Sequence, residues 1–211
     1  MGFMAMENIS PTRISLIKTK KTLKTAKTGC EVLEHKRDIL LRELRNSIYN
    51  AEQIRKTLIE ILTAAYQSLR EANIAKGTET ISDVALGSSF SANYLVDTKS
   101  IMGVAVPTVK FQNEKNVKPE YGFANTNADL DKAFQLFYKA LKLIGDLAAA
   151  EGTTYQLAND INKTQRRVNA LNYVLIPKYR DAVTWIELVL EEKEREEFIR
   201  TKRIKNMIQN K

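Results

Sequence analysis

The chain has 211 residues, with 33 Lys or Arg against 25 Asp or Glu, so its formal net charge is +8. One His and one Cys cannot form a metal site or an internal disulfide, and no stretch approaches the roughly 20 apolar residues needed to cross a bilayer. Walker A and dinucleotide-binding spacings are absent. The sequence therefore predicts no active site and no cofactor, and it leaves open whether residues 1–5 are native or an added leader.

Residues 10–74 are predicted to form one long N-terminal helix, because Gly29 is the only helix breaker after its start. Ser10 is expected to cap this helix, with Pro11 at its first position. Steps of seven residues give two mostly apolar series, which predict a left-handed coiled coil. The a series is Leu16, Leu23, Cys30, Arg37, Leu44, Ala51, Leu58, Ala65 and Ala72, and the d series is Thr19, Ala26, Leu33, Leu40, Ser47, Ile54, Ile61 and Ser68.

Residues 75–126 differ in composition, since this quarter of the chain holds half of its Gly and half of its Pro. Residues 94–96 and 101–106 are apolar runs that flank the polar residues 97–100, which predicts a short β-hairpin with a turn at 97–100. Pro107 is expected at an edge or a strand end. A segment this long is not a simple turn, so it is predicted to be a small head.

Residues 127–206 are predicted to form the C-terminal helix, capped by Asn127 or Asp129 and bent locally at Pro177. About 60 helical residues span roughly 90 Å. We therefore predict a single elongated domain over residues 1–211. Its class is mainly α, a long antiparallel two-helix left-handed coiled coil with a small head that contains a short β-hairpin. The expected seam is Leu130, Phe134, Phe137, Leu141, Ile144 and Ala148, then, after a phase slip near Gly152, Leu157, Ile161, Thr164, Val168, Leu171, Leu175, Lys178, Ala182, Trp185 and Val189.

The head half of the predicted seam is wider than two strands require, because several residues outside the a and d positions are also apolar. Either the head folds back onto the helices, or this face binds another subunit. The candidate docking residues are Leu41, Ile48, Leu62, Leu69, Leu136 and Leu143.

Charged residues are also ordered along the chain. Residues 10–29 carry only basic charges and residues 187–197 are rich in Glu, so an antiparallel arrangement predicts that these segments pair. Residues 199–211 are basic, which leaves an alternative function, a coiled-coil module that binds a membrane surface or nucleic acid. Nucleic acid is not expected, because no aromatic residues are interleaved with the basic ones. His35 falls at an outer heptad position and is expected to be solvated.

Several segments resemble the D subunit of archaeal and vacuolar-type ATPases over nearly the whole chain. The most specific match is residues 163–177 (KTQRRVNALNYVLIP), and residues 101–107 (IMGVAVP) are similar to the head of that family. Further matches are residues 11–13 (PTR), Leu23, Ala26, Gly29, Leu33, residues 36–38 (KRD), Tyr121-Gly122 and residues 191–196 (EEKERE). Asn172 departs from the usual Glu of the family, and Glu34 departs from a frequent Lys.

The resemblance implies a central rotor shaft in a rotary ATPase, on the cytoplasmic side of the plasma membrane and only indirectly associated with it. The shaft would couple ATP synthesis or hydrolysis to H⁺ or Na⁺ transport. Its expected partners are the ring of A and B subunits, the F subunit and the rotor connector (the C or d subunit), with no nucleotide bound by this chain. Candidate ring contacts are Arg13, Lys20, Arg166 and Arg167.

Overall fold

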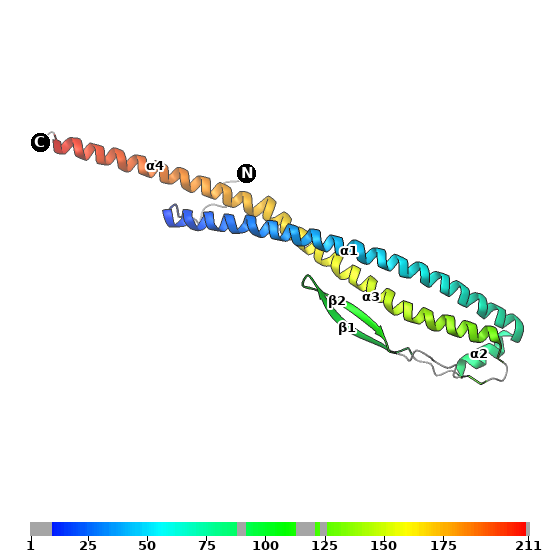
Figure 1. The fold of residues 1–211 in the computed structure, drawn as a ribbon. Helices are drawn as coiled ribbons and strands as arrows, with labels where there is room; N and C mark the ends of the chain where they lie inside the picture. Colours follow the sequence, from blue (N-terminus) through cyan, green and yellow to red (C-terminus); the bar gives the residue numbers. More distant parts are fainter. Residues whose placement is uncertain (1–9, 88–91, 113–120, 123–125, 210–211) are drawn as a thin grey trace. The chain divides into compact units, whose positions relative to one another are not determined.

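The structure is a computed structural model that describes residues 10–87, 92–112, 121–122 and 126–209 (Figure 1). Long helices and a small two-stranded antiparallel sheet confirm the predicted mainly-α class with a hairpin-containing head. Residues 1–5 lie outside the described residues. The chain divides into two compact units, which we call the terminal unit (residues 1–38 and 162–211) and the head unit (residues 39–161).

Helix α1 (Arg13–Lys76) runs for 64 residues, and every a and d position predicted for it is buried or half-buried. The heptad prediction for this helix is therefore confirmed. The predicted cap was wrong, because Thr12 rather than Ser10 caps the helix. The hydroxyl of Thr12 accepts a hydrogen bond from the backbone N–H of Ser15 at 3.1 Å, which satisfies one of the free donors of the first turn.

The C-terminal helix is divided into α3 (Ala128–Ala170), a π-helical turn η1 (Leu171–Leu175) and α4 (Ile176–Gln209). In the terminal unit, Arg13 contacts Glu194 and Arg37 contacts Gln165. The later residue of α1 thus contacts the earlier residue of the C-terminal helix, so the two paired helical segments are antiparallel.

The head unit shows the same direction of pairing between α1 and α3. The hydroxyls of Ser47 and Thr154 lie 3.0 Å apart, and the rings of Tyr66 and Phe137 meet edge to face at 5.3 Å between centroids. Asn127, a predicted cap, directly precedes α3, and its carbonyl accepts the N–H of Leu130 at 3.0 Å.

The predicted hairpin exists, but its turn was placed wrongly. Strands β1 (Tyr94–Ile101) and β2 (Val104–Phe111) pair antiparallel, so residues 97–100 are part of a strand. The turn is Met102-Gly103, and both residues have positive φ (51° and 82°), as a tight hairpin turn requires. The glycine at position 103 could have indicated this turn from the sequence, because glycine readily adopts positive φ. Pro107 pairs with Thr98 in a two-stranded sheet, where each strand is an edge and a missing N–H is tolerated.

The hairpin packs on the helices of the head unit through one apolar cluster and two glycines. Val104 and Val106 are buried in a cluster with Leu40 of α1 and Leu157 of α3. A further pair of contacts explains why α3 contains glycine in its interior. A Cβ on Gly145 would lie 2.7 Å from the Tyr94 ring, and one on Gly152 would lie 2.8 Å from the Pro107 ring.

Helix α2 (Thr78–Leu86) follows α1 directly and was not predicted. Gly77, with φ of 84°, lies between the two helices. Ile81 of α2 is buried in a cluster with Ala72 of α1 and Leu130 of α3. The apolar spacing of Ile81, Val84 and Ala85 is typical of a helix, but it is too short to stand out beside the long heptads.

The predicted seam of the C-terminal helix was wrong in two places. Ile144 and Ala148 do not lie in the buried seam, since Ile144 is 41% exposed, so the phase changes earlier than Gly152. After Leu171 the predicted seam is wrong at Leu175 and Lys178, which are exposed, while Ile176 is buried. Farther along, Ala182 is buried as predicted and Trp185 and Val189 are half-buried. At Pro177 we predicted a local bend. The irregularity there is the π-helical turn η1, in which the N–H of Ile176 bonds to the carbonyl of Leu171, five residues back.

Candidate functional site

Chemistry-bearing side chains do not converge in the part of the chain that the structure describes, where no group of three or more His, Cys, Asp or Glu could hold a metal ion. His35 is exposed, as predicted, and Cys30 is buried in the seam. Burial, followed by the nearby charges of Glu34 and Glu31, raises the pKa of the Cys30 thiol. Its thiol is thus held in the protonated, weakly reactive form.

The predicted pairing of basic and acidic segments is confirmed in the terminal unit. Arg13 lies 2.8 Å from a carboxylate oxygen of Glu194, and Lys20 lies 2.6 Å from one of Glu187. The four side chains are 40–79% exposed, so each pair contributes at most about 1 kcal/mol to stability. Their positions fix the direction and register of α1 against α4 more than they stabilise the fold.

Arg166 and Arg167, the other two candidate ring contacts, lie near the end of α3 and are exposed. They belong to the terminal unit, as do Arg13 and Lys20. The four candidate residues therefore share one unit and remain accessible from solvent, although Arg13 and Lys20 already have acidic partners within the chain.

A small polar cluster crosses the seam of the terminal unit at η1. The Cys30 thiol donates to the side-chain oxygen of Asn172 at 3.2 Å, and the Asn172 amide donates to a carboxylate oxygen of Glu34 at 3.0 Å. Glu34 and Asn172 are the two residues in whose place the family resemblance predicts Lys and Glu, respectively. The structure places the two side chains in direct hydrogen-bond contact. A Lys at position 34 would form an ion pair with a Glu at position 172. In this chain the carboxylate of Glu34 instead accepts a hydrogen bond from the neutral amide of Asn172.

Asn172→Glu is therefore expected to lower the free energy of unfolding by about 1 kcal/mol, because it replaces a hydrogen bond by two like charges. Adding Glu34→Lys should restore most of the loss, since the second change makes the pair opposite in charge. Denaturant unfolding of the two single variants and the double variant measures the coupling. Simple additivity of the two single effects would show that the residues do not interact.

The candidate docking residues all lie in the head unit, on α1 and α3. Ile48 is 41% exposed, and the other five are half-buried. Leu69 packs against the cluster that contains Ile81 of α2, so at this position the head folds back onto the long helices. The folding back explains part of the extra apolar width, and it leaves the outer side of α1 open.

On that outer side, Ile59 and Tyr66 are both more than half exposed, although one edge of the Tyr66 side chain also contacts Phe137 of α3. Ile48, Leu62 and Tyr66 follow one another at helical spacings, and they place an apolar strip along one side of α1. Arg55 interrupts the strip and pairs with Glu151 of α3 at 2.6 Å. We call Ile48, Ile59, Leu62 and Tyr66 the outer strip.

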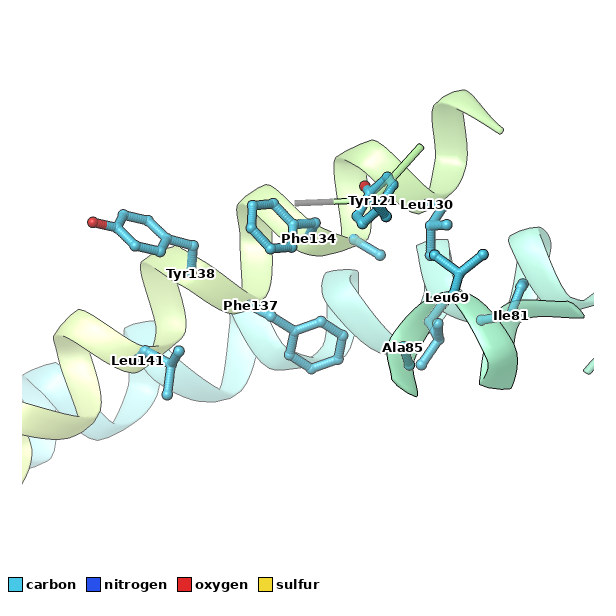
Figure 2. Close-up of a pocket in the computed structure, with 11 residues that line it drawn as sticks. Leu69, Ile81, Ala85, Tyr121, Leu130, Phe134, Phe137, Tyr138 and Leu141 are labelled. Carbon is cyan, nitrogen blue, oxygen red and sulfur yellow. The ribbon is translucent and has the colours of Figure 1, made fainter. Parts of the chain in front are cut away.

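A largely apolar cavity of about 360 Å³ lies in the head unit beside α2. Figure 2 shows Phe134 and Phe137 of α3 along it, with Leu69 and Ile81 on the neighbouring helices. Tyr121 also lines it and donates a hydrogen bond to Asp131 at 2.7 Å. Burial, followed by the hydrogen bond and charge of Asp131, raises the pKa of Tyr121 above its ordinary value, so the phenol stays a donor.

Residues 191–209 of α4 are exposed throughout, and they include the large apolar side chains Phe198, Ile204 and Met207. Sequence reasoning noted only the charged residues of this segment. The apolar residues were the missed signal, because a helix with exposed apolar side chains on several faces is typical of a segment enclosed by a partner.

In the described part of the chain, no helix combines the length and apolar character needed to span a bilayer. The fold and its surfaces define a protein of long paired helices, with interhelical ion pairs in the terminal unit and an apolar outer strip and a small hairpin in the head unit. Residues 15–206 match the family of ATP synthase D subunits, and the chain belongs to that family.

Individual relatives agree over nearly their full length. The D subunit of a V-type ATP synthase from Thermotoga neapolitana is 38% identical over 202 residues, which cover 95% of this chain and 98% of the relative. The D subunit of the A-type ATP synthase from Methanopyrus kandleri is 34% identical over 98% of this chain and 89% of its own length. That of Pyrococcus horikoshii is 36% identical over 95% of both.

Proposed function

We propose that this chain is the central rotor shaft of an A/V-type ATP synthase or ATPase, a non-catalytic subunit held at the cytoplasmic side of the plasma membrane. The shaft couples ATP synthesis or hydrolysis in the ring of A and B subunits to H⁺ or Na⁺ transport by the membrane rotor. The observation that carries the proposal is the pairing of α1 with α4 in the terminal unit and with α3 in the head unit, in a chain that belongs to the family of ATP synthase D subunits.

A shaft must transmit torque along its length, and paired helices suit this task. In the head unit, Leu40, Leu58, Ala65 and Leu157 are buried between or beside the paired helices, and in the terminal unit Cys30 and Val168 are buried together. Twisting one helix about its partner disrupts packed side chains along the seam, which resists deformation.

The terminal unit is the part that we assign to the A and B ring. Its candidate contacts are Arg13, Lys20, Arg166 and Arg167, together with the exposed apolar residues of α4. Exposed cations favour contact with acidic or polar groups of a surrounding protein, and the exposed apolar residues require a cover. The nucleotide sites lie in the ring, and this chain changes their state by turning inside it.

The head unit is the part that we assign to the F subunit and to the rotor connector (the C or d subunit). The outer strip offers the F subunit an apolar helix face with residues at helical spacing. The candidates Leu41, Leu136 and Leu143 are half-buried, and Leu69 already packs against the cluster of α2.

Leu62→Glu is expected to abolish co-purification with the co-expressed F subunit, because a charge would be buried in the contact without a partner. A mass measurement of the complex gives the readout, and circular dichroism shows whether the helices persist. Thr63→Glu provides the matched control, since Thr63 is the exposed neighbour one residue along. If the wild-type chain itself fails to bind the folded F subunit, the proposed head contact is wrong.

A further inference from the structure

We propose that η1 is a one-residue register insertion, held in place by Pro177, that selects which of two apolar stripes of α4 faces α1. The inference concerns the chain itself and does not depend on the shaft function. The evidence comes from the burial of consecutive residues after the π-helical turn and from the chemistry of Pro177.

Helix α4 carries two apolar stripes that are offset by one residue. The first is Ile176, Tyr179, Val183, Ile186 and Leu190, and the second is Leu175, Ala182, Trp185 and Val189, with Lys178 in its line. The first stripe forms the seam, because Ile176 and Val183 are buried and Ile186 is inaccessible to solvent. The second stripe continues the heptad of α3 directly, and an uninterrupted helix would turn it toward α1.

The π-helical turn accounts for the change from one stripe to the other. A π turn holds one more residue than an α turn, and one residue corresponds to about 100° of rotation about the helix axis. The N–H of Ile176 bonds to the carbonyl of Leu171 rather than to that of Asn172. As a result α4 is rotated relative to a regular continuation of α3, and Ile176 joins the cluster of Cys30 and Val168.

Pro177 is the residue that makes the regular helix unfavourable. It has no N–H to donate, and in an α-helix its ring would meet the carbonyl of Tyr173, four residues back. Pro177 directly follows the π turn, at the point where the regular α-helical bond pattern is already interrupted. Lys178 acts in the same direction, because a regular helix would turn its stem and charge toward the seam.

The second stripe is not fully exposed in the present register. Ala182 is buried, and Trp185 and Val189 are half-buried. Only part of the apolar surface must therefore change places when α4 rotates about its own axis. The turn η1 is a point at which α4 can rotate against α1 while both helices stay helical.

Trp185 is the only tryptophan of the chain, and it lies in the second stripe. In Pro177→Ala, we expect its emission to move to shorter wavelength and its quenching by acrylamide to fall by about twofold or more, because the indole enters the seam. Pro11→Ala is the control, since Pro11 precedes α1, and it should leave both signals unchanged. Unchanged Trp185 signals in Pro177→Ala would overturn the proposal.

Thiol labelling gives a second readout at adjacent positions. In a Cys30→Ser background, Leu175→Cys should react about tenfold faster than Ile176→Cys, because the two side chains are 37% and 9% exposed. Pro177→Ala should reverse this order. Retention of the order would contradict the proposal, and so would a loss of helicity in Pro177→Ala, because the regular helix is predicted to form without strain.

Discussion

Leu157→Ala is expected to lower the free energy of unfolding of the head unit by about 2–5 kcal/mol. The side chain of Leu157 is inaccessible to solvent and lies in one cluster with Leu40, Val104 and Val106. Truncation would leave a cavity where β2 meets the helix pair. The buried contacts of β2 are concentrated in this cluster, so the same change should release the hairpin before the helices separate.

Hydrogen exchange measured by mass spectrometry separates these two effects, since it reports on β1 and β2 and on the helices individually. Leu86→Ala is the matched control, because Leu86 is 83% exposed and the same truncation there should change stability by no more than about 0.5 kcal/mol. Equal effects of the two truncations would show that the hairpin does not share a core with α3.

Gly145→Ala and Gly29→Ala are expected to change stability in opposite directions. Both glycines lie inside long helices, where Ala is favoured by about 1 kcal/mol. Gly29 has open space where a methyl group would be added, so its variant should be more stable than the wild-type chain. At Gly145 the methyl group would lie 2.7 Å from the Tyr94 ring, and overpacking of this kind costs about 1–3 kcal/mol.

The Gly145 substitution should also break the hydrogen bond that Tyr94 donates to the carbonyl of Leu141 at 2.7 Å. Denaturant unfolding of both variants gives the stability difference, and exchange of the β1 amides shows whether the hairpin has left the helix. Tyr94→Phe/Gly145→Ala should lose little beyond Gly145→Ala alone, because the bond is already broken. A stabilised Gly145→Ala variant would mean that the ring is not held against α3.

The heptad of α1 could be predicted from the sequence because it repeats without interruption, and each turn of the helix supports the same assignment. The charge pairs followed from the antiparallel direction alone. The hairpin was predictable as two apolar runs, but not its turn, since the polar residues 97–100 are exposed positions within β1 rather than a loop.

The features that could not be predicted depend on contacts between distant segments. The close approach of Tyr94 to Gly145 requires the hairpin to lie on α3, which no local pattern reveals. The one-residue shift at η1 cannot be read from the sequence, because both stripes of α4 are apolar. Pro177 predicts an irregularity in the helix, but it does not predict that the irregularity is a π-helical turn. The pairing of Glu34 with Asn172 likewise needs the register between two helices.

Rotation of this chain inside an assembled complex tests the proposed shaft function most directly. Ser82 is exposed on α2, so Ser82→Cys in a Cys30→Ser background offers a site for a bead while the A and B ring is fixed to a surface. We predict that the bead turns in one direction when ATP is added and stops when ATP is withdrawn. Hydrolysis of ATP at the normal rate with a stationary bead would contradict the assignment of this chain as the rotor shaft.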